Sequence, residues 1–179
     1  MEIRPTADRA REAIFSIIGS RIEAAAVLDL FAGTGAMGLE ALSRGARSVV
    51  FVDNSRAALE LMQKNIGLCG FSARSRVVKQ DLAKGLSFLE ALAPGPGFTL
   101  VFLDPPYRLR LGHRLLAELG RRPGLLAGAA WVIAEDEAAA DLPPLAGILR
   151  LRDQRRYGDT GFWIYGIEIG PGPEDKEVN

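Results

Sequence analysis

Four aspartates stand at or near the ends of short apolar runs, and together they could assemble a ligand-binding site. They are Asp29, Asp53, Asp81 and Asp104. If the apolar runs are parallel strands, their carboxyl ends meet at one edge of a sheet, where open α/β sheets bind ligands. One acid at such an edge is unremarkable, whereas four in succession favour a site.

A glycine-rich turn follows the first of these acids. Residues 27–38 read Val-Leu-Asp-Leu-Phe-Ala-Gly-Thr-Gly-Ala-Met-Gly, the pattern of a strand, a tight loop and a helix N-terminus. Gly33 and Gly35 lack a Cβ, so they tolerate positive φ and let a ligand approach the backbone. The following helix points free N–H groups at that ligand. The alternative is an ordinary turn of an α/β fold, but Asp29 at the same strand end favours a site.

The tetrapeptide Asp104-Pro105-Pro106-Tyr107, hereafter the proline corner, is the most specific motif of the chain. Two successive prolines form a stiff, extended corner whose carbonyls stay free. The Asp104 carboxylate and the Pro105 carbonyl could then accept both hydrogens of a planar amino group, while Tyr107 stacks on the attached base. The motif predicts chemistry at an exocyclic amine; the alternative is a strand that is merely ended by prolines.

Two cofactors compete for the glycine turn. The spacing of Gly33, Gly35 and Gly38 matches the dinucleotide fingerprint, and Asp53 stands about 20 residues after the first glycine. A nicotinamide-dependent oxidoreductase is therefore one possible function. Asp29, however, stands where an anionic pyrophosphate would approach, and no redox role explains the proline corner. S-adenosylmethionine has no phosphate, and Asp29 would favour its ammonium and sulfonium groups. We therefore predict S-adenosylmethionine, with S-adenosylhomocysteine as product.

Each part of this cofactor has a predicted partner. Asp53 would accept both ribose hydroxyls, and Asp81 would accept the adenine amino group. The methionine carboxylate would find donors at the start of a first helix, which Thr6 caps and Arg4 precedes. The predicted cofactor-binding residues are Thr6, Asp29, Phe31, Gly33, Gly35, Asp53, Asn54, Asp81 and Leu82.

Strands and helices must alternate to position these residues. We expect strands at 26–30, 49–52, 76–79, 98–103 and 130–134. We expect helices at 7–18, 38–44, 82–92 and 111–119, and one that Ser55 caps. This alternation of continuous apolar runs with helices predicts an α/β fold with a doubly wound, mostly parallel sheet.

Two further strands, 148–152 and 162–169, have no helix between them. The connection over residues 154–161 is too short for a parallel crossover, so these strands should form a C-terminal antiparallel hairpin. We predict a single domain over residues 1–170 and a disordered tail over 171–179, which is rich in proline, glycine and charge.

Composition excludes several classes of protein. Cys69 is the sole cysteine and His113 the sole histidine, which excludes an internal disulfide, a cysteine zinc cluster and most histidine-based metal sites and triads, so we expect no metal. No apolar run reaches the ~20 residues of a membrane span, and the chain does not start like a secretory signal. We therefore expect a cytoplasmic protein. The formal net charge is zero, so nucleic-acid binding would need a local basic patch.

The order of these motifs resembles the class I methyltransferases that modify exocyclic amino nitrogens. Residues 4–12 (Arg-Pro-Thr-x-Asp-Arg-x-Arg-Glu) and 155–160 (Arg-x-Tyr-Gly-Asp-Thr) resemble one family among them, the bacterial 16S ribosomal RNA guanine-N2 methyltransferases. The resemblance spans residues 4–169. It implies a seven-stranded Rossmann-like sheet whose last strand is antiparallel, and methyl transfer to the exocyclic N2 of a guanine. The implied partner is 16S rRNA in the small ribosomal subunit or its assembly intermediate, and we expect a monomer.

The predicted catalytic residues are Asp104, Pro105, Pro106 and Tyr107. The arginines predicted to contact RNA around the pocket are Arg4, Arg108, Arg110, Arg155 and Arg156. The alternative for these arginines is a set of solvated side chains. Glu135 and the acids that follow it, through Asp141, are interpreted as a solvated face.

Two other functions stay open at this point. The proline corner also occurs in DNA adenine-N6 methyltransferases, although those usually carry a target-recognition domain for which this chain has no room. A non-catalytic cofactor-binding module is the second, but an intact Asp104 argues against it.

Overall fold

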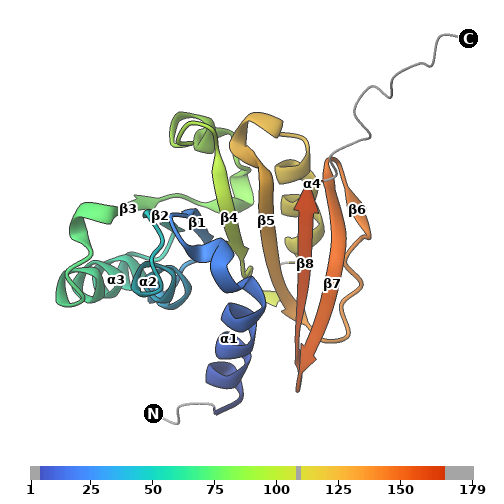
Figure 1. Ribbon diagram of the computed structural model, residues 1–179, viewed down its shortest axis with the longest axis horizontal. Helices are drawn as coiled ribbons and strands as arrows, with labels where there is room; N and C mark the ends of the chain where they lie inside the picture. Colours follow the sequence, from blue (N-terminus) through green and yellow to red (C-terminus); the bar gives the residue numbers. More distant parts are fainter. Residues whose placement is uncertain (1–4, 108–109, 168–179) are drawn as a thin grey trace, which may run out of the picture.

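One sheet of eight strands runs through the protein, whose computed structural model describes residues 5–107 and 110–167, with side chains from residue 9 (Figure 1). Across the sheet the strand order is β3-β2-β1-β4-β5-β8-β7-β6, and neighbours from β3 to β5 are parallel. The central strands β1 and β4 are apolar and buried on both faces, as parallel strands commonly are. The five parallel strands are β1 (Ala26–Leu30), β2 (Ser48–Asp53), β3 (Ser75–Lys79), β4 (Phe98–Leu103) and β5 (Leu126–Glu137).

The predicted C-terminal hairpin is present. β8 (Thr160–Ile167) lies between β5 and β7 (Leu149–Tyr157) and is antiparallel to both. The two strands of the hairpin meet at a tight turn, where Gly158 adopts a φ of 62°, so most of the expected connection over 154–161 belongs to the strands instead. The edge strand β6 (Leu145–Ala146) adds an eighth, two-residue strand to the predicted seven.

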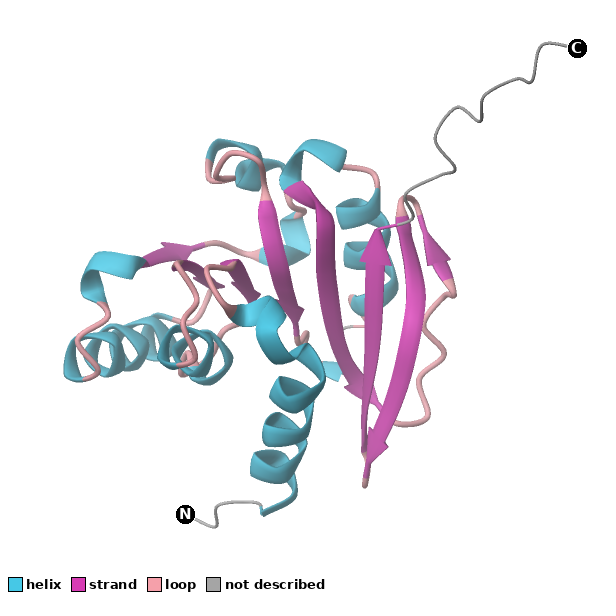
Figure 2. Cartoon of the chain, in the orientation of Figure 1, coloured by secondary structure: helices cyan, strands magenta, loops and turns pink. Residues whose placement is uncertain are grey.

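Helices cover both faces, so the sheet is doubly wound (Figure 2). One face carries α1 (Pro5–Ile18), α2 (Ala36–Ser43) and α3 (Arg56–Leu68). The other face carries α4 (Gly112–Gly120) and the 3-10 helices η3 (Leu82–Lys84) and η4 (Ser87–Ala91). Further short 3-10 helices with described bounds are η1 (Gly19–Ile22), η2 (Ser72–Arg74) and η6 (Pro123–Leu125). Within residues 5–107 and 110–167, no helix is long and apolar enough to cross a membrane.

Two helices differ from the prediction. The expected helix over 82–92 is wrong: the segment forms η3 and η4, separated by Gly85 at a φ of 100°, a conformation in which an α-helix cannot continue. The first helix begins at Pro5 instead of residue 7. Thr6 therefore stands inside the first turn and not at the capping position before it.

Candidate active site

Two aspartates hold the glycine loop between β1 and α2. Asp29, near the end of β1, is buried, and its Oδ2 accepts a hydrogen bond from the Gly38 amide at 2.9 Å. Asp53, at the end of β2, accepts one from the Gly33 amide at 2.9 Å. Gly33 and Gly35 have φ values of 54° and 82°, in the left-handed region that glycine enters without strain. Both acids therefore shape the loop, whatever contact they also make with a ligand.

Close packing fixes the path of this loop. Phe31 adopts a φ of 61°, which is rare for a residue with a Cβ, and such strain concentrates at functional sites. A Cβ on Gly38 would overlap the ring of Phe51 in β2, so a glycine is required for α2 to lie against the sheet. The third glycine of the motif thus serves packing, while Phe31 faces the pocket described next.

A pocket of about 520 Å³, hereafter the corner pocket, opens at the carboxyl ends of the strands. It joins the glycine loop to the proline corner and to the start of α3, where Ser55 caps the helix by accepting from the Ala58 amide. Seven of its nine lining residues belong to the catalytic or cofactor set assigned from the sequence. The lining residues are Phe31, Asp53, Asn54, Ser55, Asp104, Pro105, Pro106, Tyr107 and Glu135.

Two lining residues were not assigned to the site from the sequence: Ser55, which was expected only to cap a helix, and Glu135. Its interpretation as part of a solvated face is wrong, because the side chain is half-buried and lines the corner pocket. The Tyr107 hydroxyl donates a hydrogen bond to Glu135 Oε1 at 3.2 Å. The pairing of Leu103 with Ala134 brings the next residues of β4 and β5, Asp104 and Glu135, side by side. One signal was available: Glu135 follows an apolar run just as the four aspartates do.

Burial and crowding of carboxyls raise pKa values across the site. Burial raises the pKa of Asp29 to about 7, and the charges of Asp104 and Asp53 add to the effect. Partial burial of the carboxyl and the nearby Asp136 carboxylate raise the pKa of Asp104 to about 6. The rest of the Asp104 residue is exposed to solvent. Burial, and then Asp104, raise the pKa of Glu135 to about 7. Among the residues that the structure describes, the lining of the corner pocket holds three carboxyls and no lysine or arginine, an arrangement that suits a cationic ligand.

The raised pKa of Asp29 predicts that the free protein loses stability as the pH rises. The folded state binds the Asp29 proton up to pH about 7, whereas the unfolded chain releases it near pH 4, so stability falls between these values. Asp29→Asn keeps an oxygen that can accept from Gly38 and carries no charge. We expect this variant to raise the free energy of unfolding by roughly 2–4 kcal/mol at pH 8 and to change it little at pH 4.

Urea unfolding of both proteins at the two pH values measures this difference. Equal destabilisation by Asp29→Asn at pH 8 and pH 4 would mean that the pKa of Asp29 is not raised in the folded protein and that its buried charge costs nothing.

A second pocket of about 480 Å³ shares Tyr107 with the corner pocket. Arg110, predicted to contact RNA, lines it together with His113 of α4 and the acids that follow Glu135, including Asp136. Arg110 therefore shares this second pocket with Tyr107 of the proline corner. Arg4 and Arg108, assigned to the same RNA-contacting set, lie outside the described residues.

Asp81 and Leu82, assigned to the adenine, do not line the corner pocket. Asp81 ends the loop after β3 and caps η3, because its Oδ1 accepts from the Ala83 amide at 3.0 Å. Its loop follows β3, next to β2 in the sheet, so it lies at the same edge beyond Asp53. Thr6 lies in α1, and its side chain is outside those described.

The hairpin arginines stand near the same edge of the sheet. Arg155 in β7 pairs with Phe162 in β8, which in turn pairs with Glu135 in β5, so two strand spacings, roughly 10 Å, separate Arg155 from Glu135. Arg155 also forms an exposed ion pair with Asp153 at 2.9 Å. Arg156 is exposed one residue closer to the turn. In Figure 1 the turn between β7 and β8 lies at the end of the sheet where β4 and β5 terminate.

Comparisons with known proteins match this architecture. The family model described as Conserved hypothetical protein 95 matches residues 1–166. The chain is 34% identical over 166 residues to the ribosomal RNA small subunit methyltransferase D of Escherichia coli strain K12, with 93% of this chain and 80% of that protein covered.

Solved structures agree on the fold. A conserved hypothetical protein of Streptococcus pyogenes superimposes with a TM-score of 0.78 at 32% identity, over 88% of this chain and 95% of that chain. An RNA methyltransferase of Salinibacter ruber, solved with S-adenosyl-L-homocysteine, superimposes with a TM-score of 0.66 at 15% identity, over 97% of this chain and 99% of that chain. At that identity the second likeness shows the fold alone, and this fold is the Rossmann-like methyltransferase sheet predicted from the sequence.

Proposed function

Since the chain belongs to the family described as Conserved hypothetical protein 95, we propose that it is an S-adenosylmethionine-dependent rRNA methyltransferase that modifies the exocyclic N2 of a guanine in 16S rRNA. The observation that carries the proposal is the corner pocket, in which the proline corner faces the glycine loop and Asp53. The 16S rRNA would be met in the small ribosomal subunit or its assembly intermediate. An enzyme with this substrate works in the cytoplasm, and we propose that it does so as a monomer.

The described residues suit this cofactor. The carboxyls of Asp53, Asp104 and Glu135 around the corner pocket would favour the positive charges of its ammonium and sulfonium groups, and Asp53 would accept the ribose hydroxyls. The loop after β3 would receive the adenine at Asp81. When bound, S-adenosylmethionine supplies a methyl group on a sulfonium, which is an electrophile.

The proline corner prepares the nucleophile. The Asp104 carboxylate and the Pro105 carbonyl accept the two hydrogens of the guanine amino group, which aims the nitrogen at the methyl carbon, and Tyr107 stacks on the base. Transfer of the methyl group from sulfur to this nitrogen would make the nitrogen acidic, and it would then release one proton. Asp104 can accept that proton, since its pKa of about 6 lies near the working pH.

Glu135 supports guanine over adenine as the target. Guanine carries a hydrogen on N1, beside its amino group, whereas N1 of adenine is an acceptor. In its ionised form, which a pKa of about 7 leaves roughly half populated at neutral pH, Glu135 beside Asp104 can accept the guanine N1–H and repels the lone pair of adenine N1. The hydrogen bond from Tyr107 holds Glu135 in that position. This arrangement favours guanine-N2 methylation over the DNA adenine-N6 alternative.

The direct test locates the methyl group by mass spectrometry. Label transfer from S-adenosylmethionine is compared on isolated small subunits, protein-free 16S RNA and duplex DNA. Because the corner pocket accepts one extruded, stacked base, we expect an accessible guanine in structured RNA to be modified, and subunits to be better substrates than naked RNA. Labelling of duplex DNA and of neither RNA would favour the adenine-N6 alternative, and labelling of none would favour a non-catalytic module.

The hairpin arginines should contribute to RNA affinity. Each arginine that contacts a phosphate adds close to one unit to the salt slope of binding, so Arg155→Ala with Arg156→Ala should flatten that slope by about two units. Affinity should fall for all RNA sequences alike, and S-adenosylmethionine affinity should stay the same. Fluorescence anisotropy over a salt series measures both quantities.

A matched control removes two charges at the opposite edge. Arg121→Ala with Arg122→Ala lies next to the start of β5, and Arg122, like Arg155, has an acidic partner, Glu90. This pair should leave the slope unchanged. Equal slopes for both double variants would show that the hairpin arginines are solvated side chains.

A further inference from the structure

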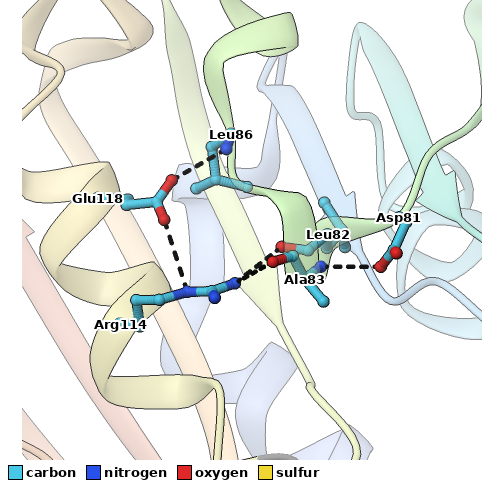
Figure 3. Close-up of polar contacts among 6 residues, drawn as sticks. All are labelled: Asp81, Leu82, Ala83, Leu86, Arg114 and Glu118. Atoms are coloured by element: carbon cyan, nitrogen blue, oxygen red, sulfur yellow. Dashed lines mark hydrogen bonds and ion pairs between the residues drawn. The ribbon is translucent and has the colours of Figure 1, made fainter.

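Two side chains of α4, Arg114 and Glu118, form hydrogen bonds with the backbone of the segment that follows Asp81 (Figure 3). Arg114 Nη2 donates to the carbonyls of Leu82 and Ala83, at 3.2 and 3.0 Å. Glu118 Oε2 accepts from the Leu86 amide at 2.9 Å. Glu118 Oε1 also lies 3.6 Å from Arg114 Nε, so the two side chains support each other.

These hydrogen bonds satisfy backbone groups that would pair within the segment if it were an α-helix. η3 has only three residues, and within this turn the Leu82 carbonyl accepts from the Gly85 amide at 3.2 Å, while Arg114 adds a second donor to Leu82 and supplies one to Ala83. The Arg114 guanidinium is planar and carries several donors in a fixed arrangement, which lets one group satisfy two successive carbonyls. Glu118 is the more buried of the pair, with a side chain 19% exposed against 46% for Arg114. Its ion pair with the guanidinium restricts the orientation of Arg114.

Ala83 links these hydrogen bonds to Asp81. Its amide donates to Asp81 Oδ1 at 3.0 Å, while its carbonyl accepts from Arg114. The same residue therefore orients the carboxylate on one side and is held by the guanidinium on the other. Figure 3 shows the chain of contacts from Glu118 through Arg114 and Ala83 to Asp81. Without Arg114, the Leu82 and Ala83 carbonyls lose the hydrogen bonds from α4, so the Ala83 amide that orients the Asp81 carboxylate is held less firmly.

We propose that Arg114, oriented by Glu118, is a positioning residue that sets Asp81 for the adenine amino group of the cofactor. The inference rests on the proposed function, because it assumes that Asp81 receives the adenine. Arg114 touches neither cofactor nor substrate in this scheme. It acts on affinity and on base selectivity, and it leaves the methyl transfer step unchanged.

Calorimetry with S-adenosyl-L-homocysteine tests the inference. Arg114→Met keeps the apolar stem and removes the donors, and we expect the Kd to rise about 5- to 10-fold. Arg114→Lys should recover most of that loss, since an ammonium can still donate to a carbonyl. The matched control is Arg44→Met, which removes the arginine of another Arg–Glu pair spaced four residues apart, at the C-terminal end of α2. The control should bind like the wild type.

Two readouts separate positioning from general damage to the fold. In an Asp81→Ala background, Arg114→Met should add less than a twofold effect, because the group it positions is gone. S-inosyl-L-homocysteine, which has a carbonyl in place of the adenine amino group, should lose at most twofold on Arg114→Met. On small subunits, KM for S-adenosylmethionine should rise while kcat stays within twofold.

The outcomes of these experiments test the role of Arg114 separately from the proposed function. A folded Arg114→Met that binds S-adenosyl-L-homocysteine like the wild type would overturn the inference, as would an equal loss with and without Asp81. Failure of the wild type to bind S-adenosyl-L-homocysteine at all would instead overturn the proposed function. Thermal melting monitored by circular dichroism establishes which variants are folded.

Discussion

Asp104→Ala should lower kcat by about 100- to 1000-fold, the loss typical of removing one polar group aimed at a reacting centre. Without the carboxylate, the guanine amino group keeps only the Pro105 carbonyl as acceptor and no longer points its lone pair at the methyl carbon. The variant also removes the proposed proton acceptor, whose pKa burial has raised to about 6. The affinity for S-adenosyl-L-homocysteine should stay within about threefold of the wild type, because Asp104 serves the amine and not the nucleoside.

Label transfer to small subunits measures this loss. Glu137→Gln is the matched control, since Glu137 is a nearby acid of β5 that lines the second pocket instead of the corner pocket and is not among the groups that raise the pKa of Asp104. This control should keep most of kcat. An Asp104→Ala protein that retains a tenth or more of the wild-type turnover would remove Asp104 from the catalytic role.

The second large effect concerns the cofactor: Asp53→Ala should weaken S-adenosylmethionine binding about 10- to 100-fold. A hydrogen bond to a charged group contributes roughly 1.5–3 kcal/mol, and the ribose hydroxyls would lose theirs. Asp53 also accepts from the amides of Gly33 and Ser55, at 2.9 and 2.8 Å, so its removal loosens the glycine loop and the start of α3. The affinity for S-adenosylmethionine should therefore fall both because the ribose loses an acceptor and because the loop around the cofactor loosens.

Asp53→Asn helps to separate these two causes. The amide keeps one accepting oxygen, so one of the loop contacts can survive while the charge is lost, and its Kd should lie between those of the wild type and Asp53→Ala. Calorimetry gives all three values. Unchanged affinity in a folded Asp53→Ala protein would exclude Asp53 from the site, and tighter binding of NAD than of S-adenosylmethionine would favour a dehydrogenase.

Much of this site follows from local sequence. Asp29, Asp53 and Asp104 lie at strand ends, and strands are recognisable because an apolar run of five or six residues is a local property. The hairpin was predictable because a short connection cannot make a parallel crossover. The proline corner was predictable because proline restricts its own backbone wherever it occurs.

Other features required the tertiary structure. Glu135 joins the corner pocket only because β5 lies next to β4 in a register that sets it beside Asp104, and register is a property of two strands. The segment after Asp81 reads as a helix by composition, yet it folds as η3 and η4. There Gly85 breaks the turn, and Arg114 and Glu118, about 30 residues later, satisfy its backbone.

The roles of the acids divide in the same way. The sequence by itself determined that these aspartates reach the carboxyl edge of the sheet. Apolar runs and the lengths of the connections between them are properties of short stretches of sequence and can be recognised without the fold. Only the tertiary structure decided what each acid does there, because hydrogen bonds and shifted pKa values depend on neighbours from distant segments. Asp29 illustrates the difference: its position was predictable, but its bond to Gly38 and its buried charge arise only when α2 packs against the sheet.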